Sequence, residues 1–254
     1  MRRKIFATIA VLAVALTAIA SGANPKTDFK SIPLKENYSQ LIVSAAIDVA
    51  LSDSVKDIRV YAPEVVMKHL TVEQEGGTLR IAMRRDVKLK LRERPRIVIP
   101  TRMSVNYIEL RNAASLQTGK LVREMLDIYL TGASTLRGNF EGKRLTIEQA
   151  GASDVKAHVA VENIALNLSA ASTMEIRGRV FFKMDVSMIE ASSLDAEKLE
   201  VRRIEGSLDG ASNAILWCTE RMAVPVRGAS HLVYIGRPLV ANCPTSDVST
   251  VVHK

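Results

Sequence analysis

Aromatic side chains are scarce in this sequence, because Phe, Trp and Tyr together make up 4% of its 254 residues. Globular β-sandwiches usually build their cores around larger anchors of this kind, so the composition argues against such a core. Ala, Val, Leu and Ile are abundant instead. They predict a thin, repetitive core in a chain long enough for one or two domains.

Cysteine and histidine are also few, with two Cys and four His in the chain. Cys218 and Cys243 have no further Cys or His at the spacing of a zinc site, so no metal site is predicted. No cofactor is predicted either. The histidines share no motif and are expected on the solvated surface: His69, His158, His231 and His253.

The long uncharged run of the sequence lies at its N-terminus. Arg2, Arg3 and Lys4 precede residues 5–20, and Ala18 and Ala20 offer small side chains at a cleavage site. This pattern predicts a signal peptide over residues 1–20 and an exported protein, whether periplasmic, on the outer surface or secreted. A membrane anchor is the alternative, but the run is at the short end for crossing about 30 Å of hydrocarbon. No later segment resembles a transmembrane helix.

A small-residue tripeptide recurs through the second half of the chain. Its central alanines are spaced by about 19 residues throughout, a regularity that chance does not supply in seven copies. The copies are Asn112-Ala113-Ala114, Gly132-Ala133-Ser134, Gly151-Ala152-Ser153, Ala170-Ala171-Ser172, Glu190-Ala191-Ser192, Gly210-Ala211-Ser212 and Gly228-Ala229-Ser230.

Apolar residues flank most copies at fixed distances, as Ile128, Leu130 and Leu136 do around Ala133. Apolar residues two apart mark the inward face of a strand, so each repeat predicts a strand, a tight turn and a strand. Glycine suits the first turn residue if the backbone there has a positive φ.

Three copies replace this glycine, with Asn112, Ala170 and Glu190. In these copies we expect either another type of turn or a local weakening of the repeat. The serines of the tripeptides have no His or Asp at a fixed distance that could activate them, so they are expected to be turn residues rather than nucleophiles.

A period of about 19 residues without a helical pattern predicts an all-β fold, a parallel β-helix or β-solenoid built as a two-sheet superhelix. We expect the solenoid repeats over residues 101–254, and an N-terminal β cap with the first coil over residues 21–100. A β-sandwich with coincidentally similar turns is the alternative. The six-residue period of left-handed hexapeptide helices is absent, although the repeat alone does not fix the handedness.

The N-terminal third predicts further strands. Residues 57–61 alternate in polarity, and residues 70–74 and 78–83 flank the turn Glu75-Gly76-Gly77 as a hairpin. One or two helical turns are expected after Pro63. Ser44-Ala45-Ala46 resembles an early copy of the repeated turn.

Three of these features carry a resemblance to a known family. Residues 44–49, the Glu75-Gly76-Gly77 hairpin and the serial Gly-Ala-Ser turns are similar to those of the putative auto-transporter adhesin, head GIN domain, from about Phe29 to at least Leu232. The resemblance implies a Gram-negative envelope protein with a pectin-lyase-like two-sheet superhelix and an adhesive role. The family brings no catalytic residues, and this sequence has Ala where the family motif often has a second Gly.

An enzyme is the alternative, because right-handed β-helices include lyases and hydrolases of acidic polysaccharides. Their sites need clustered outward carboxylates with a cation. Acidic residues here are scattered singly, at Asp127, Asp154, Asp185, Asp195 and Asp209. No catalytic residue is therefore predicted.

The positive charge of the chain is concentrated in one segment. The formal net charge is +8, and residues 84–96 contribute +5 through seven cations and two carboxylates. As a strand, the segment would present a cationic stripe suited to an anionic surface, or its lysines would protect a sheet edge from aggregation. The cations are Arg84, Arg85, Lys88, Lys90, Arg92, Arg94 and Arg96.

Cys218 and Cys243 are predicted to form a disulfide that fastens the final coil, since an oxidising compartment permits one. Two free thiols are the alternative. The segment Pro244-Thr245-Ser246 resembles the repeated turn, but Thr245 follows Ala229 by less than one full repeat, which predicts an irregular last rung.

The sequence therefore predicts a non-catalytic envelope or secreted binding protein that presents a repetitive solenoid surface. The alternatives are a polysaccharide-active enzyme of pectin-lyase-like fold and a structural protein of envelope assembly. The partner is left open between a glycan, lipopolysaccharide, a protein surface and a second copy of the chain. Nucleic acid is not expected, because recognition helices and stacking aromatics are absent.

Overall fold

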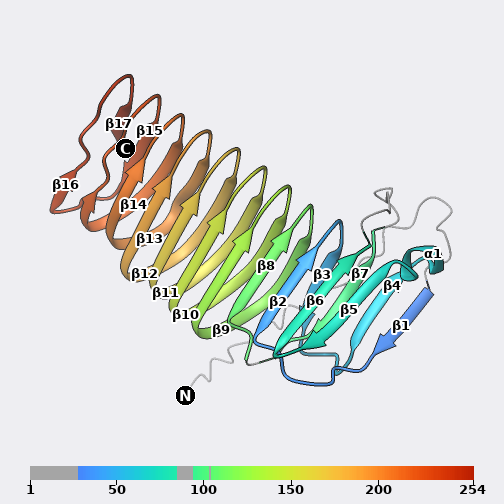
Figure 1. The fold of residues 1–254 in the computed structure, drawn as a ribbon. Helices are drawn as coiled ribbons and strands as arrows, with labels where there is room; N and C mark the ends of the chain where they lie inside the picture. The colour runs from blue at the N-terminus through green and yellow to red at the C-terminus, as the bar shows by residue number, and fades with distance from the viewer. Residues whose placement is uncertain (1–27, 85–93, 103) are drawn as a thin grey trace, which may run out of the picture.

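The computed structural model describes residues 28–84, 94–102 and 104–254. This part of the chain is nearly all β structure, wound into a solenoid of about eight coils of about 19 residues each. We call each coil a rung, and Figure 1 shows the rungs stacked in a row. The predicted fold class is confirmed, whereas the predicted signal peptide lies outside the described residues.

Each regular rung is one long strand with a bend near its middle. The strand leaves a tight turn along one sheet, which we call the first sheet, bends, and returns along the other, the second sheet, to the next turn. The regular strands are β9 (Ser115–Leu130), β10 (Thr135–Gln149), β11 (Asp154–Leu168), β12 (Thr173–Met188), β13 (Ser193–Leu208) and β14 (Asn213–Ala223).

Neighbouring rungs pair in parallel, offset by one repeat. Thr135 pairs with Asp154, and Asp154 pairs with Thr173, so the alanines two residues before them lie on neighbouring rungs. The predicted stacking of Ala133, Ala152 and Ala171 is thereby confirmed.

The first residue of every tripeptide has a left-handed backbone. Its φ is 74° at Gly132, and it stays positive where glycine is replaced, at 55° in Asn112, 59° in Ala170 and 62° in Glu190. The expectation of another turn type holds at Asn112, where Ala113 also has a positive φ of 67°. It is wrong at Ala170 and Glu190, where only the first residue has a positive φ, as in the glycine copies. A non-glycine residue in this region costs about 1–2 kcal/mol.

The third tripeptide residue points into the core. Ser134, Ser172 and Ser212 are fully buried, and the hydroxyls of Ser134 and Ser212 donate to the carbonyl oxygens of Thr131 and Asp209, each at 2.8 Å. These bonds satisfy polar groups that would otherwise be orphaned inside the turn. The serines are turn residues, as predicted.

Ladders of aliphatic side chains fill the space between the two sheets. Ile128, Ile147, Leu166 and Val186 pair on four successive rungs, and all are buried. Because each rung repeats the same inward positions, short branched side chains fill the interior without large aromatic anchors. The thin core that the composition predicts is therefore present.

The first rung in sequence lies inside the stack rather than at its end. Its strands are β2 (Gln40–Ser44) and β3 (Asp48–Ser52). Strand β2 pairs with β6 (Thr78–Met83) on one side and β8 (Tyr107–Arg111) on the other, while β3 pairs with β7 (Arg96–Pro100) and β9.

The turn of this rung is one residue later than the sequence indicated. Ser44 pairs with Arg111, and Asp48 pairs with Ser115, so Ala45, with a φ of 78°, corresponds to Asn112. The structural relative of the repeated turn is therefore Ala45-Ala46-Ile47.

Antiparallel elements occupy the end of the stack beyond β6 and β7 (Figure 1). They are β1 (Asp28–Ile32), β4 (Ile58–Ala62) and β5 (Leu70–Glu75), with the helix α1 (Glu64–Met67) following Pro63. The predicted helical turn and the β5–β6 hairpin are confirmed. That these elements act as a cap stays a prediction.

Strands β15 (His231–Ile235) and β16 (Val240–Asn242) form the rung after β14, and β17 (Thr250–His253) pairs with β15 and begins one further rung. Asp247 has a φ of 60° and follows Gly228, the first residue of the previous turn, by one full repeat. The backbone N–H of Gly228 donates to the Asp247 carboxylate at 3.1 Å. The last turn therefore follows the previous one at the regular repeat distance. The sequence-based assignment of Thr245 to this turn was wrong, because Thr245 pairs with Val226, which lies before the previous turn.

Candidate binding surface

The predicted cationic segment is only partly described. Arg85, Lys88, Lys90 and Arg92 lie outside the described residues. Arg94 binds the Ala113 carbonyl and pairs with Asp48 at 3.3 Å, which leaves 21% of its side chain exposed. Arg84 and Arg96 are exposed. Arg94 thus holds a turn in place, and a binding role for the segment stays a prediction.

The two cysteines are free thiols in the structure, one buried and one partly buried. Cys218 lies in β14 and donates to the carbonyl oxygen of Arg221 at 3.1 Å, while Cys243 follows β16. Burial raises the pKa of both thiols, so both stay protonated at neutral pH. The disulfide between them stays a prediction.

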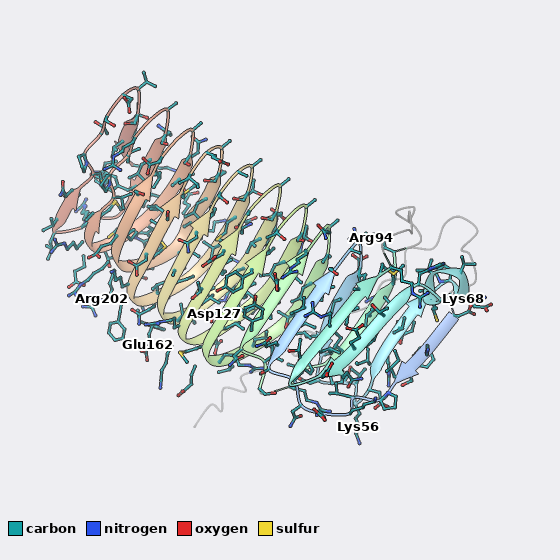
Figure 2. All side chains as sticks on the ribbon, in the orientation of Figure 1. Lys56, Lys68, Arg94, Asp127, Glu162 and Arg202 are labelled. Atoms are coloured by element: carbon teal, nitrogen blue, oxygen red, sulfur yellow. The ribbon has the colours of Figure 1, made fainter. Side chains whose placement is uncertain are left out.

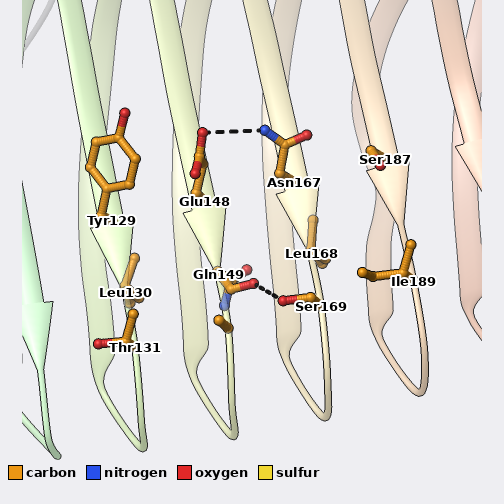
Figure 3. Close-up of a pocket in the computed structure, with 11 residues that line it drawn as sticks. Tyr129, Leu130, Thr131, Glu148, Gln149, Asn167, Leu168, Ser169, Ser187 and Ile189 are labelled. Atoms are coloured by element: carbon orange, nitrogen blue, oxygen red, sulfur yellow. Dashed lines mark hydrogen bonds between the residues drawn. The ribbon is translucent and has the colours of Figure 1, made fainter.

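A groove of about 360 Å³ opens on the second sheet beside the turns (Figure 3). A row of polar side chains runs along this groove. Each of them is the residue four positions before the central alanine of a tripeptide. Glu148 pairs with Tyr129 and with Asn167, and Asn167 pairs with Ser187. These four outward side chains therefore stand side by side on β9 to β12, at about 4.8 Å per rung.

Two tyrosines lie at the N-terminal end of the groove. The rings of Tyr107 and Tyr129 are 5.2 Å apart with an interplanar angle of 32°. Burial raises the pKa of both phenols, with a further contribution from Glu109 at Tyr107 and from Glu148 at Tyr129. The phenols are therefore neutral at physiological pH. The Tyr107 hydroxyl donates to Glu109 Oε2 at 3.2 Å, and the Tyr129 hydroxyl can donate to a ligand.

Small side chains hollow out the rest of the groove. Ala150, Ser169 and Ser187 line it between Tyr129 and Ile189. The Ser169 hydroxyl donates to the Gln149 carbonyl at 3.0 Å (Figure 3).

The same groove offers both acceptors and donors to a ligand. Asn167 Nδ2 donates to Glu148 Oε1 at a long 3.4 Å, which leaves the amide and the carboxylate free to rearrange around another partner. An aromatic face beside a carboxylate, an amide and hydroxyls suits a ligand with one apolar face and many hydroxyl groups.

The structure brings together carboxylates that are scattered in the sequence, in the pairs Glu175–Asp195 and Asp185–Glu205. Asp185 and Glu205 pair on adjacent rungs, and Lys183 Nζ lies 2.9 Å from the first carboxylate and 2.8 Å from the second. Lys183 lowers the pKa of Glu205, whereas a general acid needs a raised one. Within residues 28–84, 94–102 and 104–254, no three His, Cys, Asp or Glu side chains form a metal-binding group.

The first sheet has a different outward surface. Lys120, Asn139, His158, Arg177 and Lys198 form a row on successive rungs. Carboxylates interleave with these and neighbouring cations, as in the ion pairs Lys120–Glu141 and Lys156–Glu175 at 2.7 and 2.8 Å. Because positive and negative side chains compensate one another here, this face has no excess of one sign of charge that would attract an oppositely charged ligand.

The groove was not predicted from the sequence, although the repeats carry a signal for it. In each repeat one residue lies between the two inward apolar positions and must point outward. Reading this position down the copies gives Glu109, Tyr129, Glu148, Asn167, Ser187 and Ser207.

Among the residues that the structure describes, no helix has the length and hydrophobicity needed to cross a membrane. No curated protein matches the chain.

Several solved structures share the fold of this chain. A putative lipid binding protein from Parabacteroides distasonis ATCC 8503 has a TM-score of 0.79 and 17% identity, over 91% of this chain and 98% of its own. A putative adhesin from the same strain has a TM-score of 0.77 and 16% identity, over 91% and 95%. A putative adhesin from Parabacteroides merdae ATCC 43184 has a TM-score of 0.78 and 13% identity, over 91% and 97%. These likenesses show a shared fold.

The family model of the putative auto-transporter adhesin, head GIN domain, matches residues 37–238, which include the inserted first rung, all the regular rungs and the groove. Its extent agrees with the resemblance that the turns and the hairpin indicated. The chain therefore belongs to the putative auto-transporter adhesin, head GIN domain family.

Proposed function

We propose that this chain is a non-catalytic adhesin of the bacterial envelope that binds a glycan in the groove on its second sheet. One observation carries the proposal, namely the row of Tyr129, Glu148, Asn167 and Ser187 on successive rungs. A straight row of polar groups repeats at the rung spacing, so it can follow an extended ligand one unit after another.

The chemistry of the groove favours a saccharide over other extended ligands. A sugar ring has an apolar face that packs on an aromatic ring, and its hydroxyls bond to carboxylates and amides. A rigid solenoid also binds without ordering itself, which limits the entropy lost on association. The adhesin descriptions of the family and of two structural neighbours support this class of function.

A glycan array probed with the purified protein tests the proposal, followed by calorimetry with the strongest ligand. Tyr129→Ala and Asn167→Ala should each weaken binding about tenfold or more, the loss expected when a stacking or hydrogen-bonding anchor is removed. The matched control is Tyr234→Ala, because Tyr234 is a partly exposed tyrosine on β15, far from the groove.

Several outcomes would contradict the proposal. Binding to no glycan on the array, or equal losses in Tyr129→Ala and Tyr234→Ala, would exclude the groove as a glycan site. Release of unsaturated or reducing sugars from polysaccharides by the purified protein would assign it to the enzymes instead.

A further inference from the structure

The edge of the solenoid opposite the turns carries an exposed apolar row. We call it the bend edge, and it comprises residues 122–125, 142–144, 162–163, 181–183, 202–203, 219–221 and 239–240, where each strand passes from the first sheet to the second. Figure 2 shows Glu162 and Arg202 along this edge. Within the described ranges, eleven large apolar side chains are exposed, and six of them lie here: Val122, Met125, Phe181, Phe182, Leu239 and Val240.

These six side chains form three pairs at regular intervals. Val122 and Met125 lie at the bend of β9, Phe181 and Phe182 at the bend of β12, and Leu239 and Val240 at the start of β16. The rungs of β10 and β11 separate the first two pairs, and those of β13 and β14 separate the last two. The pairs are therefore collinear, with steps of about 14 Å.

A bulge exposes the two phenylalanines together. The pairing of β11 with β12 shifts between Val161 and Asn163, so both phenylalanines oppose the single residue Glu162. Their side chains are 43% and 50% exposed, beside a hollow of about 600 Å³ lined also by Arg179 and Arg202. The chain has five Phe in all, and exposing two at one bend favours an apolar partner for that bend.

Cations flank the apolar pairs. Arg123 donates to the carbonyl oxygens of Val105 and Val122, and Lys183 pairs with the carboxylates of Asp185 and Glu205. Without these two, the bend edge has five cations against three carboxylates. Arg202 and Arg203 share the single carboxylate of Glu220, at 3.3 and 3.2 Å, so one positive charge there is in excess. The cations are Lys143, Arg144, Arg202, Arg203 and Arg221, and the carboxylates are Glu124, Glu162 and Glu220.

The shape of the edge selects among the partners that could cover it. A ridge about 30 Å long and about 10 Å wide offers roughly 300 Å², well below the roughly 800 Å² per partner of a stable protein interface. A second copy of the chain would also bring two positive edges together. A bilayer surface is continuous, so a straight ridge can bind to it without a pocket of matching shape. The phosphate groups of the lipid headgroups complement the positive charge of the edge.

We propose that the bend edge docks the solenoid side-on onto an anionic phospholipid surface, with the Phe181–Phe182 pair inserted at the level of the headgroups. The glycan groove lies beside the turns, at the opposite edge, so the docked solenoid would present that groove away from the lipid. The two proposals rest on different residues and can fail separately.

Co-sedimentation with lipid vesicles tests this proposal. The purified protein should bind vesicles of phosphatidylglycerol and phosphatidylethanolamine, bind those of phosphatidylcholine weakly, and detach as salt is raised. The double variant Phe181→Ser/Phe182→Ser should lower the partition constant about tenfold or more. The double variant Arg202→Glu/Arg203→Glu should lower it similarly and flatten the salt dependence.

The matched control is Val252→Ser, because Val252 is 46% exposed, like the two phenylalanines, but lies on β17, outside both the bend edge and the groove. It should leave vesicle binding unchanged, and the thermal midpoint of every variant should match that of the parent. Equal binding to neutral and anionic vesicles, no binding to either, or an equal loss in Val252→Ser would overturn the proposal. A dimer in sedimentation velocity that Phe181→Ser/Phe182→Ser dissociates would assign the edge to a second copy instead.

Discussion

Replacement of Gly206 by alanine tests how tightly the rungs are stacked. Gly206 lies in β13, where the inward ladder of apolar residues is interrupted, and its φ is 149°, a conformation that residues with a Cβ rarely adopt. An alanine Cβ at this position would lie 1.7 Å from the carbonyl oxygen of Val186 on the neighbouring rung. That oxygen belongs to the backbone of β12, so no side-chain rotation can relieve the overlap.

The cost follows from two local terms. Holding alanine at this φ costs about 1–3 kcal/mol. Separating the two rungs by more than about 1 Å would break neighbouring ladder hydrogen bonds, at about 1 kcal/mol each. We therefore expect Gly206→Ala to destabilise the fold by about 3–5 kcal/mol, a large part of the roughly 5–15 kcal/mol that stabilises a typical domain.

Urea denaturation followed by far-ultraviolet circular dichroism measures this loss. Gly119→Ala is the matched control, because Gly119 also lies within a long strand but has an ordinary φ and open space where its Cβ would stand. It should be neutral, or stabilise by up to about 1 kcal/mol through the unfolded chain. Equal urea midpoints for Gly206→Ala and Gly119→Ala would show that the rungs separate freely, which would refute the reasoning.

Three further predictions concern single residues. Glu190→Gly should raise the unfolding free energy by about 0.5 kcal/mol, because it relieves the left-handed strain at a φ of 62°; a lower urea midpoint would contradict it. Tyr38 is buried, and its hydroxyl donates to the Pro100 carbonyl at 2.8 Å. Burial raises the pKa of Tyr38 above its ordinary value of 10.0, so its contribution to stability should be complete below pH 10 and decline as the pH rises further. Tyr38→Phe should cost about 1 kcal/mol at pH 7 and show a smaller loss between pH 7 and pH 11 than the parent, and equal losses in both proteins would rule this out. Thiol titration of the denatured, unreduced protein should find no free cysteine if Cys218 and Cys243 are joined after export, and two reactive thiols would exclude the bond.

The repeat made most of the fold predictable. Central alanines spaced by about 19 residues, with apolar residues two apart before them, admit few structures other than stacked rungs. The hairpin was equally clear, because Gly76 and Gly77 both take the positive φ that a two-residue turn between antiparallel strands needs. These signals are local, so they do not depend on how the rest of the chain folds.

Non-local pairing decides the features of the fold that local sequence patterns do not predict. Nothing near Ser44 indicates that β2 and β3 insert between the strands β6 and β7 on one side and β8 and β9 on the other, because that order depends on hydrogen bonds between distant segments. The turn at Glu190 looked irregular by composition, yet the rungs on either side hold it in the common geometry.

The sequence by itself determined the class of fold, the period of the rungs and the inward positions, since these follow from the alternation of side chains along one strand. Only the tertiary structure decided which outward side chains become neighbours. Tyr129, Glu148 and Asn167 lie one full repeat apart in the chain, and they form one groove because parallel pairing stacks them. The apolar pairs of the bend edge likewise become one row only because the rungs stack in a straight line, where each strand bend lies above the last.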